Sequence, residues 1–351
     1  MIILLLPVIP GNCINLNFVH HVTAGTTIFT DNSVISELNY KPELSLLLFR
    51  QNNRKVDSEF IYNLNYSYSD ESDFTSNLYR GWLRYASRQT EIRIGLQKIN
   101  FGPAIILRSL QWFDRIDPQD PTQTTDGRKA ILTRYYFLNN ANLWFWGIWG
   151  DESETSISDF FLEKDNPELG GRIQFPFDYC EAAFSYNHKK IIDAGFENRF
   201  GLDARWDFEI GFWAELMVSH FSEADTEYKR SITLGADYTF SFGNGIYFLT
   251  EYCSFSQMKT DFFEIEENSD YAALSITYPL SIYDEISSLL TSNLDTMDIY
   301  YSFTYHRTYD YISFYINLYL NPEVKNFHKH NMYKNKISKD NSLQLLLQCD
   351  F

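Results

Sequence analysis

The chain has 351 residues, with 46 acidic and 29 basic side chains and a formal net charge of −17 at pH 7. Nucleic-acid binding rests on basic patches, so this charge excludes nucleic acid as a partner. Aromatic residues make up 17% of the chain, which excludes a disordered protein, yet the mean hydropathy is −0.31. Such a chain must place aromatic and polar side chains on separate surfaces, as strands between lipid and water do.

The N-terminal segment 1–10 is apolar and too short to cross a bilayer as a helix. It looks like the hydrophobic region of a secretory signal peptide, although no Lys or Arg precedes it. We therefore interpret residues 1–16 as a signal-peptide remnant whose basic start lies upstream, and residues 17–351 as an outer-membrane β-barrel. Past residue 16 no stretch resembles a transmembrane helix, so any membrane contact must come from a barrel.

Most of the chain alternates between apolar and polar residues with a period of two. In 199–207, Phe200, Leu202 and Trp206 alternate with Arg and Asp residues; segments 60–68, 90–99, 231–241 and 312–321 behave alike. This is the periodicity of strands, and about ten residues is the length of a membrane strand. A soluble sandwich would carry charges on its outer face and use shorter strands. We predict an all-β fold, a transmembrane antiparallel up-and-down β-barrel of about 16–18 strands.

The connections alternate between short and long, as in outer-membrane barrels with short periplasmic turns and long external loops. Counting from the C-terminus, loop 100–129 is external. The final segment 343–351 is amphipathic and ends in Phe351, which resembles the insertion signal of bacterial outer-membrane barrels. The expected short links lie near 88–89, 139–141, 177–178, 208–209, 243–245 and 307–310, and the expected long links at 69–76, 100–129, 151–167, 189–198, 222–229, 257–270 and 322–341.

Residues 92–102, Ile-Arg-Ile-Gly-Leu-Gln-Lys-Ile-Asn-Phe-Gly, resemble a strand and turn of porins and alginate-export-like barrels, with Leu96 in place of the usual Arg. The resemblance covers about 11 residues. It implies a channel of the Gram-negative bacterial outer membrane for passive diffusion or export of small hydrophilic solutes, without catalysis and without a cofactor. Outer-membrane lipid and lipopolysaccharide are the implied partners. Porins are commonly trimers, so a homo-oligomer is allowed, although no sequence feature demands one.

Strand parity predicts which charged side chains face the lumen. The arginines gather in the N-terminal half and the acids near residues 200–251, so opposed charges could create a transverse field that orients dipolar solutes. The alternative is that neighbouring Arg and acidic side chains pair along the wall. The predicted pore-lining residues are Arg80, Arg84, Arg93, Arg134, Arg172, Arg199, Arg205, Glu91, Asp203, Asp207, Glu215, Asp237 and, next to these, Glu251.

The segment after Phe101 is too long and too apolar for a freely solvated loop. We predict that it folds into the barrel and narrows it, with acidic side chains facing the wall arginines Arg80, Arg84 and Arg93. The alternative is a loop over the rim or on a neighbouring subunit. The residues assigned to this constriction loop are Trp112, Phe113, Asp114, Asp117 and Asp120.

Two other functions stay open. A non-conducting outer-membrane barrel could serve in secretion, adhesion or assembly. An outer-membrane lipid hydrolase would need a nucleophile and a base, for which His306 with Ser302 and Thr304 is the only constellation. The four cysteines lack CxxC spacing, so no metal site is predicted. A further set of aromatic residues is expected in girdles at the membrane interfaces, the alternative being ordinary packing on a sheet. They are Trp144, Trp146, Trp149, Tyr300, Tyr301, Tyr305, Tyr309 and Tyr311.

Overall fold

The fold was analysed in a computed structural model, which describes residues 15–149, 167–191, 195–223, 228–258, 265–321 and 341–351. Its regular elements are strands of 7 to 18 residues. The strands are β1 (Asn15–Phe29), β2 (Val34–Gln51), β3 (Arg54–Tyr68), β4 (Ser72–Ala86), β5 (Thr90–Gln97), β6 (Arg128–Tyr136), β7 (Asn142–Ile148), β8 (Glu168–Pro176), β9 (Cys180–Ile191), β10 (Gly195–Asp207), β11 (Gly211–Phe221), β12 (Tyr228–Phe240), β13 (Ile246–Met258), β14 (Ile265–Pro279), β15 (Asp284–Asn293), β16 (Asp298–Thr308), β17 (Ile312–Leu320) and β18 (Ser342–Asp350).

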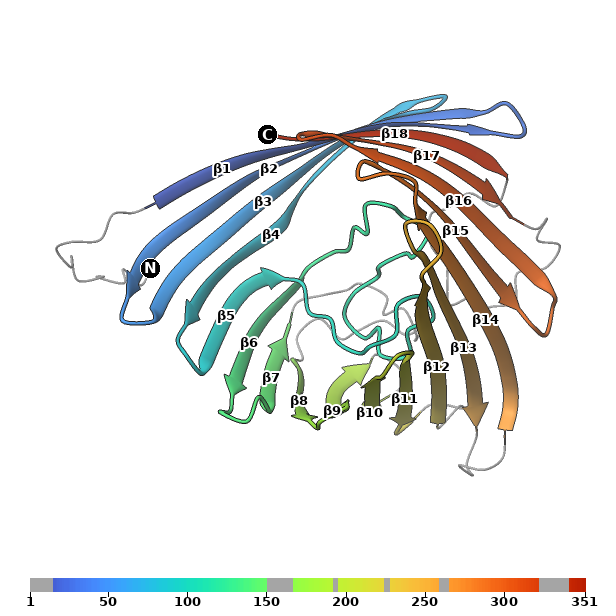
Figure 1. The fold of residues 1–351 in the computed structure, drawn as a ribbon. Helices are drawn as coiled ribbons and strands as arrows, with labels where there is room; N and C mark the ends of the chain where they lie inside the picture. Colours follow the sequence, from blue (N-terminus) through green and yellow to red (C-terminus); the bar gives the residue numbers. More distant parts are fainter. Residues whose placement is uncertain (1–14, 150–166, 192–194, 224–227, 259–264, 322–340) are drawn as a thin grey trace.

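The strands form one closed antiparallel ring (Figure 1). Each strand pairs with its neighbours in the sequence, and β1 pairs with β18, from His21 opposite Asp350 to Phe29 opposite Ser342. The terminal Phe351 completes this seam, because its backbone exchanges two hydrogen bonds with His20 and its ring stacks on the His20 ring. The predicted up-and-down barrel is confirmed, and its 18 strands lie at the upper end of the expected range. No edge strand is left to pair with another chain.

The two faces of the ring differ as the period-two pattern predicts. On β10 the side chains of Phe200, Leu202 and Trp206 point outward, whereas Arg199 and Asp203 point inward. On β11 every second residue from Gly211 to Phe221 is buried and the others are partly or fully exposed. The exposed apolar residues therefore form the outer surface, where hydrocarbon can replace water without leaving a backbone group unpaired.

The connections are sorted between the two ends of the ring. At one end all are short turns, at 52–53, 87–89, 137–141, 177–179, 208–210, 241–245, 280–283 and 309–311. The long connections, including 98–127, 149–167 and 321–341, all lie at the other end. The predicted asymmetry is present, which places 98–127 at the end with long loops.

Three expected long connections were wrong in length. The expected loop 69–76 is the turn 69–71, because β4 already begins at Ser72; β9 reaches Ile191, and β13 and β14 extend to Met258 and Ile265. Backbone hydrogen bonds between strands do not require apolar side chains, so the polar strand ends beyond the apolar surface continue the sheet. For the same reason several strands, such as β2 with 18 residues and β14 with 15, exceed the expected ten.

Several expectations fall on the segments outside the described residues. The signal-peptide remnant lies there apart from Asn15 and Leu16, which belong to β1. Most of loop 151–167 and of loop 322–341 lies there too. Among the described residues, no helix is long and apolar enough to cross a membrane.

Candidate functional site: the lumen and its inner loop

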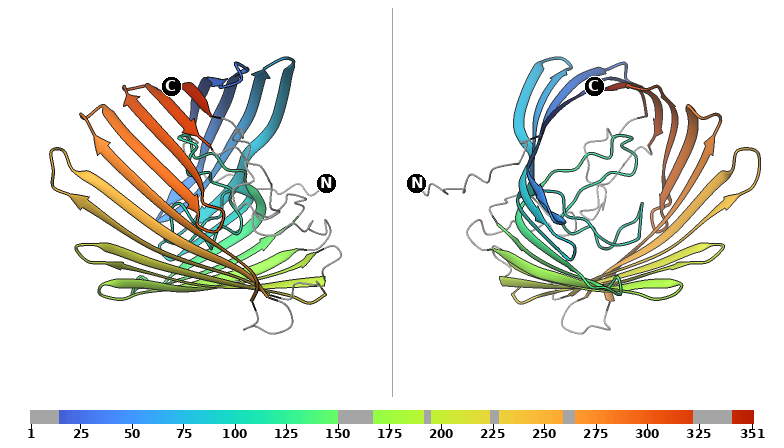
Figure 2. Two further views of the ribbon diagram at one scale, coloured as in Figure 1. Left: turned by 90° about the vertical axis from the view of Figure 1, so that its right-hand side faces the viewer. Right: turned by 60° about the vertical axis from the view of Figure 1, so that its left-hand side comes forward.

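Residues 98–127, which connect β5 to β6, lie inside the ring (Figure 2). We call this segment the inner loop. Its middle portion is buried against the barrel wall, with Leu107, Ser109 and Leu110 no more than 1% exposed. A segment of this length without regular structure must find its hydrogen-bond partners elsewhere, and it finds them on strands far away in the sequence.

Two wall carboxylates hold the inner loop by its backbone. Glu215 of β11 accepts hydrogen bonds from the amides of Ala104 and Leu110, both at 2.9 Å. Glu251 of β13 accepts from the consecutive amides of residues 105, 106 and 107 at 2.5–2.9 Å, and from the Trp213 indole at 3.0 Å. These carboxyl oxygens replace the water that the buried loop amides would otherwise need as acceptors. The two glutamates therefore fix one edge of the inner loop on β11–β13.

Hydroxyl groups supply a third attachment. The Ser109 hydroxyl lies 2.7 Å from that of Ser231 and 2.8 Å from that of Thr233, both on β12. The Thr233 hydroxyl donates to the Leu107 carbonyl at 2.6 Å. Polar groups buried in this way are costly unless they are paired, so the pairing specifies where the loop sits.

Apolar side chains of the inner loop pack on the wall in two clusters. One joins Phe101, Trp112 and Phe113 to Trp146 of β7, with ring centroids 5.2–6.2 Å apart. The other joins Ile106 and Leu107 to side chains of β11 and β13–β15. The inner loop is thus packed against the wall as densely as a protein core.

Two glycines make the close approach of the loop feasible. A Cβ atom at Gly201 of β10 would lie 2.8 Å from Leu110 and 3.0 Å from the Trp112 ring. Gly102 has a φ of +93°, and a Cβ atom there would lie 2.3 Å from Glu215 Oε1. Only glycine combines that backbone conformation with that contact.

The predicted lumenal charges all lie on the inner wall, and six of the seven arginines pair with carboxylates there. Arg80 instead donates to the Thr125 carbonyl of the inner loop at 2.6 Å. These arginines and carboxylates therefore pair locally along the wall, as the alternative interpretation expected. They do not form two separated blocks of opposite charge that would create a transverse field. The pairs are Arg84–Asp57, Arg93–Glu91, Arg134–Glu91, Arg172–Asp203, Arg199–Glu197, Arg205–Asp207 and Arg205–Asp237.

The expected contacts between loop acids and the wall arginines Arg80, Arg84 and Arg93 were wrong. Asp114 pairs with Arg108 of the inner loop itself at 2.8 Å. Asp117 accepts from the amide of Gln119, and Asp120 accepts from the backbone and hydroxyl groups of residues 122 and 124. All three aspartates therefore find their partners within the inner loop itself. Burial raises the pKa of Asp117, because its charged form is poorly solvated.

Of the residues expected in an interfacial girdle, Trp149, Tyr309 and Tyr311 are 42%, 52% and 69% exposed, but the expected place of Trp144 and Trp146 was wrong. Both side chains point into the barrel: Trp146 packs in the first apolar cluster, and Arg134 lies 3.9 Å from the centroid of the Trp144 ring. Phe145 between them is 57% exposed and takes the outer position. The inner loop is apolar here and packs on an apolar part of the wall. Trp144 and Trp146 therefore face inward, although a wall in contact with water would place them on the outer face.

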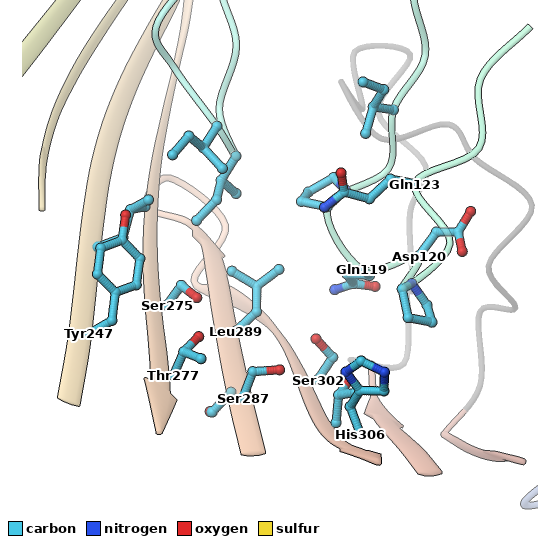
Figure 3. A pocket seen from close by; sticks show the side chains of 18 of the residues that line it. Gln119, Asp120, Gln123, Tyr247, Ser275, Thr277, Ser287, Leu289, Ser302 and His306 are labelled. Atoms are coloured by element: carbon cyan, nitrogen blue, oxygen red, sulfur yellow. The ribbon is translucent and has the colours of Figure 1, made fainter. Parts of the chain in front are cut away.

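A cavity of about 480 Å³ remains between the inner loop and β13–β17. Its wall is rich in hydroxyl groups, and Figure 3 shows several of them facing Gln119 and Gln123 of the inner loop. We call five of these residues the hydroxyl wall. They are Ser275, Thr277, Ser287, Ser302 and Thr304.

The residues expected for a lipid hydrolase, His306 with Ser302 and Thr304, line this cavity. His306 lines it, but its Nε2 lies 2.8 Å from the Thr308 hydroxyl and its ring stacks on Tyr315 at 4.2 Å. These contacts differ from the serine–histidine pairing that a hydrolase needs. Within the part of the chain that the structure describes, no three His, Cys, Asp or Glu residues are grouped as metal ligands.

The way in which the wall holds the inner loop was not predicted from the sequence. Glu215 and Glu251 were assigned to the lumenal face, but as contributors to a field and not as anchors. Their signal is an acidic residue flanked on its own face by apolar ones, as in Trp213-Ala-Glu215-Leu-Met217. The hydroxyl wall was missed except for Ser302 and Thr304, although Ser275 and Thr277, and again Ser302 and Thr304, alternate with apolar residues.

Comparison with known proteins identifies the fold of the chain but does not assign the chain to a family. No family model matches the chain, and no curated protein matches it. Among solved structures, the outer membrane protein OpdK of Pseudomonas aeruginosa superimposes with a TM-score of 0.66 at 10% identity, over 96% of this chain and 99% of that one. OprD of the same organism gives 0.63 at 11% identity, over 96% and 95%. OmpF of Salmonella typhi gives 0.53 at 10% identity, over 96% and 97%. The chain thus has the fold of outer-membrane porins.

Proposed function

We propose that the protein is a channel of the bacterial outer membrane through which small hydrophilic solutes diffuse. The observation that carries the proposal is a closed ring with an apolar exposed outer surface, a charged and hydroxyl-rich inner surface, and a cavity beside the inner loop. Such a wall offers lipid on one side and water on the other. The porin-like fold supports the same function.

The inner loop sets the width of the passage in this proposal. Because Glu215, Glu251 and Ser109 fix it to β11–β13, the space left for solutes lies on the side of β13–β17. Because residues 92–102 resemble a segment of alginate-export-like barrels, the proposed passage includes export of solutes as well as their uptake. Lipid and lipopolysaccharide would surround the outer surface, and a homo-oligomer would cover part of it.

Single-channel recording in potassium chloride tests the proposal. The full chain, folded in detergent and checked for heat-modifiable gel mobility, should give discrete current steps in a planar bilayer. Deletion of residues 105–120 should raise the unitary conductance, because it removes the packed part of the loop. The double variant Glu215→Gln/Glu251→Gln keeps the chain length and should raise current noise.

The outcomes separate the candidate functions. A folded barrel that gives no current and no liposome swelling would reject the channel and favour the non-conducting barrel. Unchanged conductance in a folded 105–120 deletion would reject the inner loop as the constriction. Hydrolysis of lipid that is lost in His306→Ala would favour the hydrolase.

A further inference from the structure

The wall of the cavity carries an ordered grid of uncharged groups. Thr277 lies opposite Ser287 across the β14–β15 pair, and Ser287 lies opposite Thr304 across β15–β16. Asn317 of β17 and Gln344 of β18 continue this row. Neighbouring strands lie about 4.8 Å apart, so hydrogen-bonding groups recur at that interval around nearly a third of the ring.

The adjacent row alternates between apolar and hydroxyl groups. In register order it runs Leu249, Ser275, Leu289, Ser302 and Tyr319. Figure 3 shows Leu289 between hydroxyl-bearing side chains, with Gln119 across the cavity. A surface of this kind matches a solute that has both hydroxyl edges and carbon–hydrogen faces.

The hydroxyl wall is available to a ligand. Within the described part of the chain, the five side chains of the hydroxyl wall and the amide groups of Gln119 and Gln123 make no hydrogen bond to other residues. Neighbouring lumenal groups are occupied, as Tyr247 shows by donating to Asp237 at 3.0 Å. Unoccupied donors and acceptors on a packed wall are an ordered set of partners for a polar ligand.

Charge is sparse around the cavity and mostly compensated. Arg108 is paired with Asp114, and Asp120 accepts hydrogen bonds from residues 122 and 124. Glu285 lies at the end of the wall near the turn 280–283, opposite the titratable His306. An anion would meet no free cationic group among these residues, and it would lose hydration without replacement.

We propose that this cavity binds uncharged polyhydroxylated solutes, of which a hexose is the simplest example. The interval between hydrogen-bonding groups along a row is similar to that between alternate hydroxyl groups on a sugar ring. This inference rests on the proposed channel function, since the solute must reach the lumen. It adds a substrate class that the barrel fold does not specify.

Binding and conduction are measured separately. Titration calorimetry in detergent with glucose, gluconate and glucosammonium reports affinity without requiring transport. Single-channel recording with the same three probes, at matched bulk conductivity, reports residence in the open channel. We expect saturable glucose binding, and the weakest binding for gluconate because its carboxylate meets no free cationic group among the lining residues. Glucosammonium should bind no more tightly than glucose, because Glu285 lies at the end of the wall and not among its five hydroxyl groups.

The decisive variant is Ser275→Ala/Ser287→Ala/Ser302→Ala. Each lost hydrogen bond weakens binding roughly two- to tenfold, so the triple variant should weaken glucose binding by at least about tenfold. Ser45→Ala is the control, because this hydroxyl bonds Glu43 on β2, away from the cavity.

Each outcome has a defined reading. Tighter binding of gluconate or glucosammonium than of glucose would overturn the inference, as would equal loss in Ser45→Ala. Absence of glucose binding in a conducting channel would overturn the inference and leave the channel standing. Glucose binding without any current would support the inference about the cavity and overturn the proposed channel.

Discussion

Glu251 and Leu107 are 144 positions apart in the sequence, and Glu251 Oε2 accepts the Leu107 amide at 2.5 Å. The same carboxylate accepts from the amides of Ile105 and Ile106. A single side chain thus organises one turn of the inner loop. Because the loop has no regular structure, its position depends on such contacts and not on its own backbone pairing.

Replacement of Glu251 by glutamine should release this turn. One oxygen becomes an NH₂ group, which faces two donors, and an unsatisfied buried donor costs about 1–3 kcal/mol. We expect local opening to become easier by about 2 kcal/mol, or roughly thirtyfold faster hydrogen exchange at residues 104–110, with the strands unaffected. Glu285→Gln removes a lumenal charge without a loop contact and should leave that exchange unchanged. Equal acceleration in both variants would mean that charge, not anchoring, controls the loop.

Gly201 should be intolerant of even one methyl group. Its added Cβ would meet Leu110 and Trp112 at 2.8 and 3.0 Å, so Gly201→Ala must displace packed side chains at a cost of about 1–3 kcal/mol. The matched control is Gly25→Ala on β1, where the nearest atoms lie at 3.5 and 3.6 Å, an ordinary contact. Urea unfolding of both variants measures the difference. Equal stability of the two would show that the loop does not press on β10.

The sequence predicted the barrel because strand alternation is a local property. Each residue of β10 or β11 faces lipid or lumen according to its parity, and neighbouring strands need no further information to pair. The attachment of the inner loop depends on contacts more than 100 positions apart, such as Ala104 with Glu215. The alternation of apolar and polar residues along the strands does not indicate these contacts. For this reason the apolar loop was identified, whereas its anchors and the inward turn of Trp144 and Trp146 were not.

Asp203 and Asp207 lie on the same face of β10 but should respond differently to amidation. Asp203 is 7% exposed and pairs with Arg172, which also lies 5.1 Å from the Phe101 ring centroid. Asp203→Asn would leave that buried guanidinium uncompensated, at a cost of about 3–5 kcal/mol. Asp207 is 66% exposed, and its partner Arg205 keeps Asp237, so Asp207→Asn should cost less than about 1 kcal/mol. Urea midpoints compare the two, and similar losses would contradict this assignment of burial.

Asp117 should give the inner loop a pH dependence that Asp117→Asn removes. Because burial raises the pKa of this carboxyl, the folded chain binds its proton more tightly than the unfolded chain does. The resulting stability is complete below the unfolded pKa and is lost as pH rises through the higher folded pKa. Asparagine imitates the protonated acid and can still accept from the Gln119 amide, which bonds Asp117 at 2.8 Å. The variant should therefore melt above the parent protein at pH 7.5, and the two should converge below about pH 4. A lower melting point at pH 7.5 would mean that the charged acceptor stabilises the Gln119 turn by more than its burial costs.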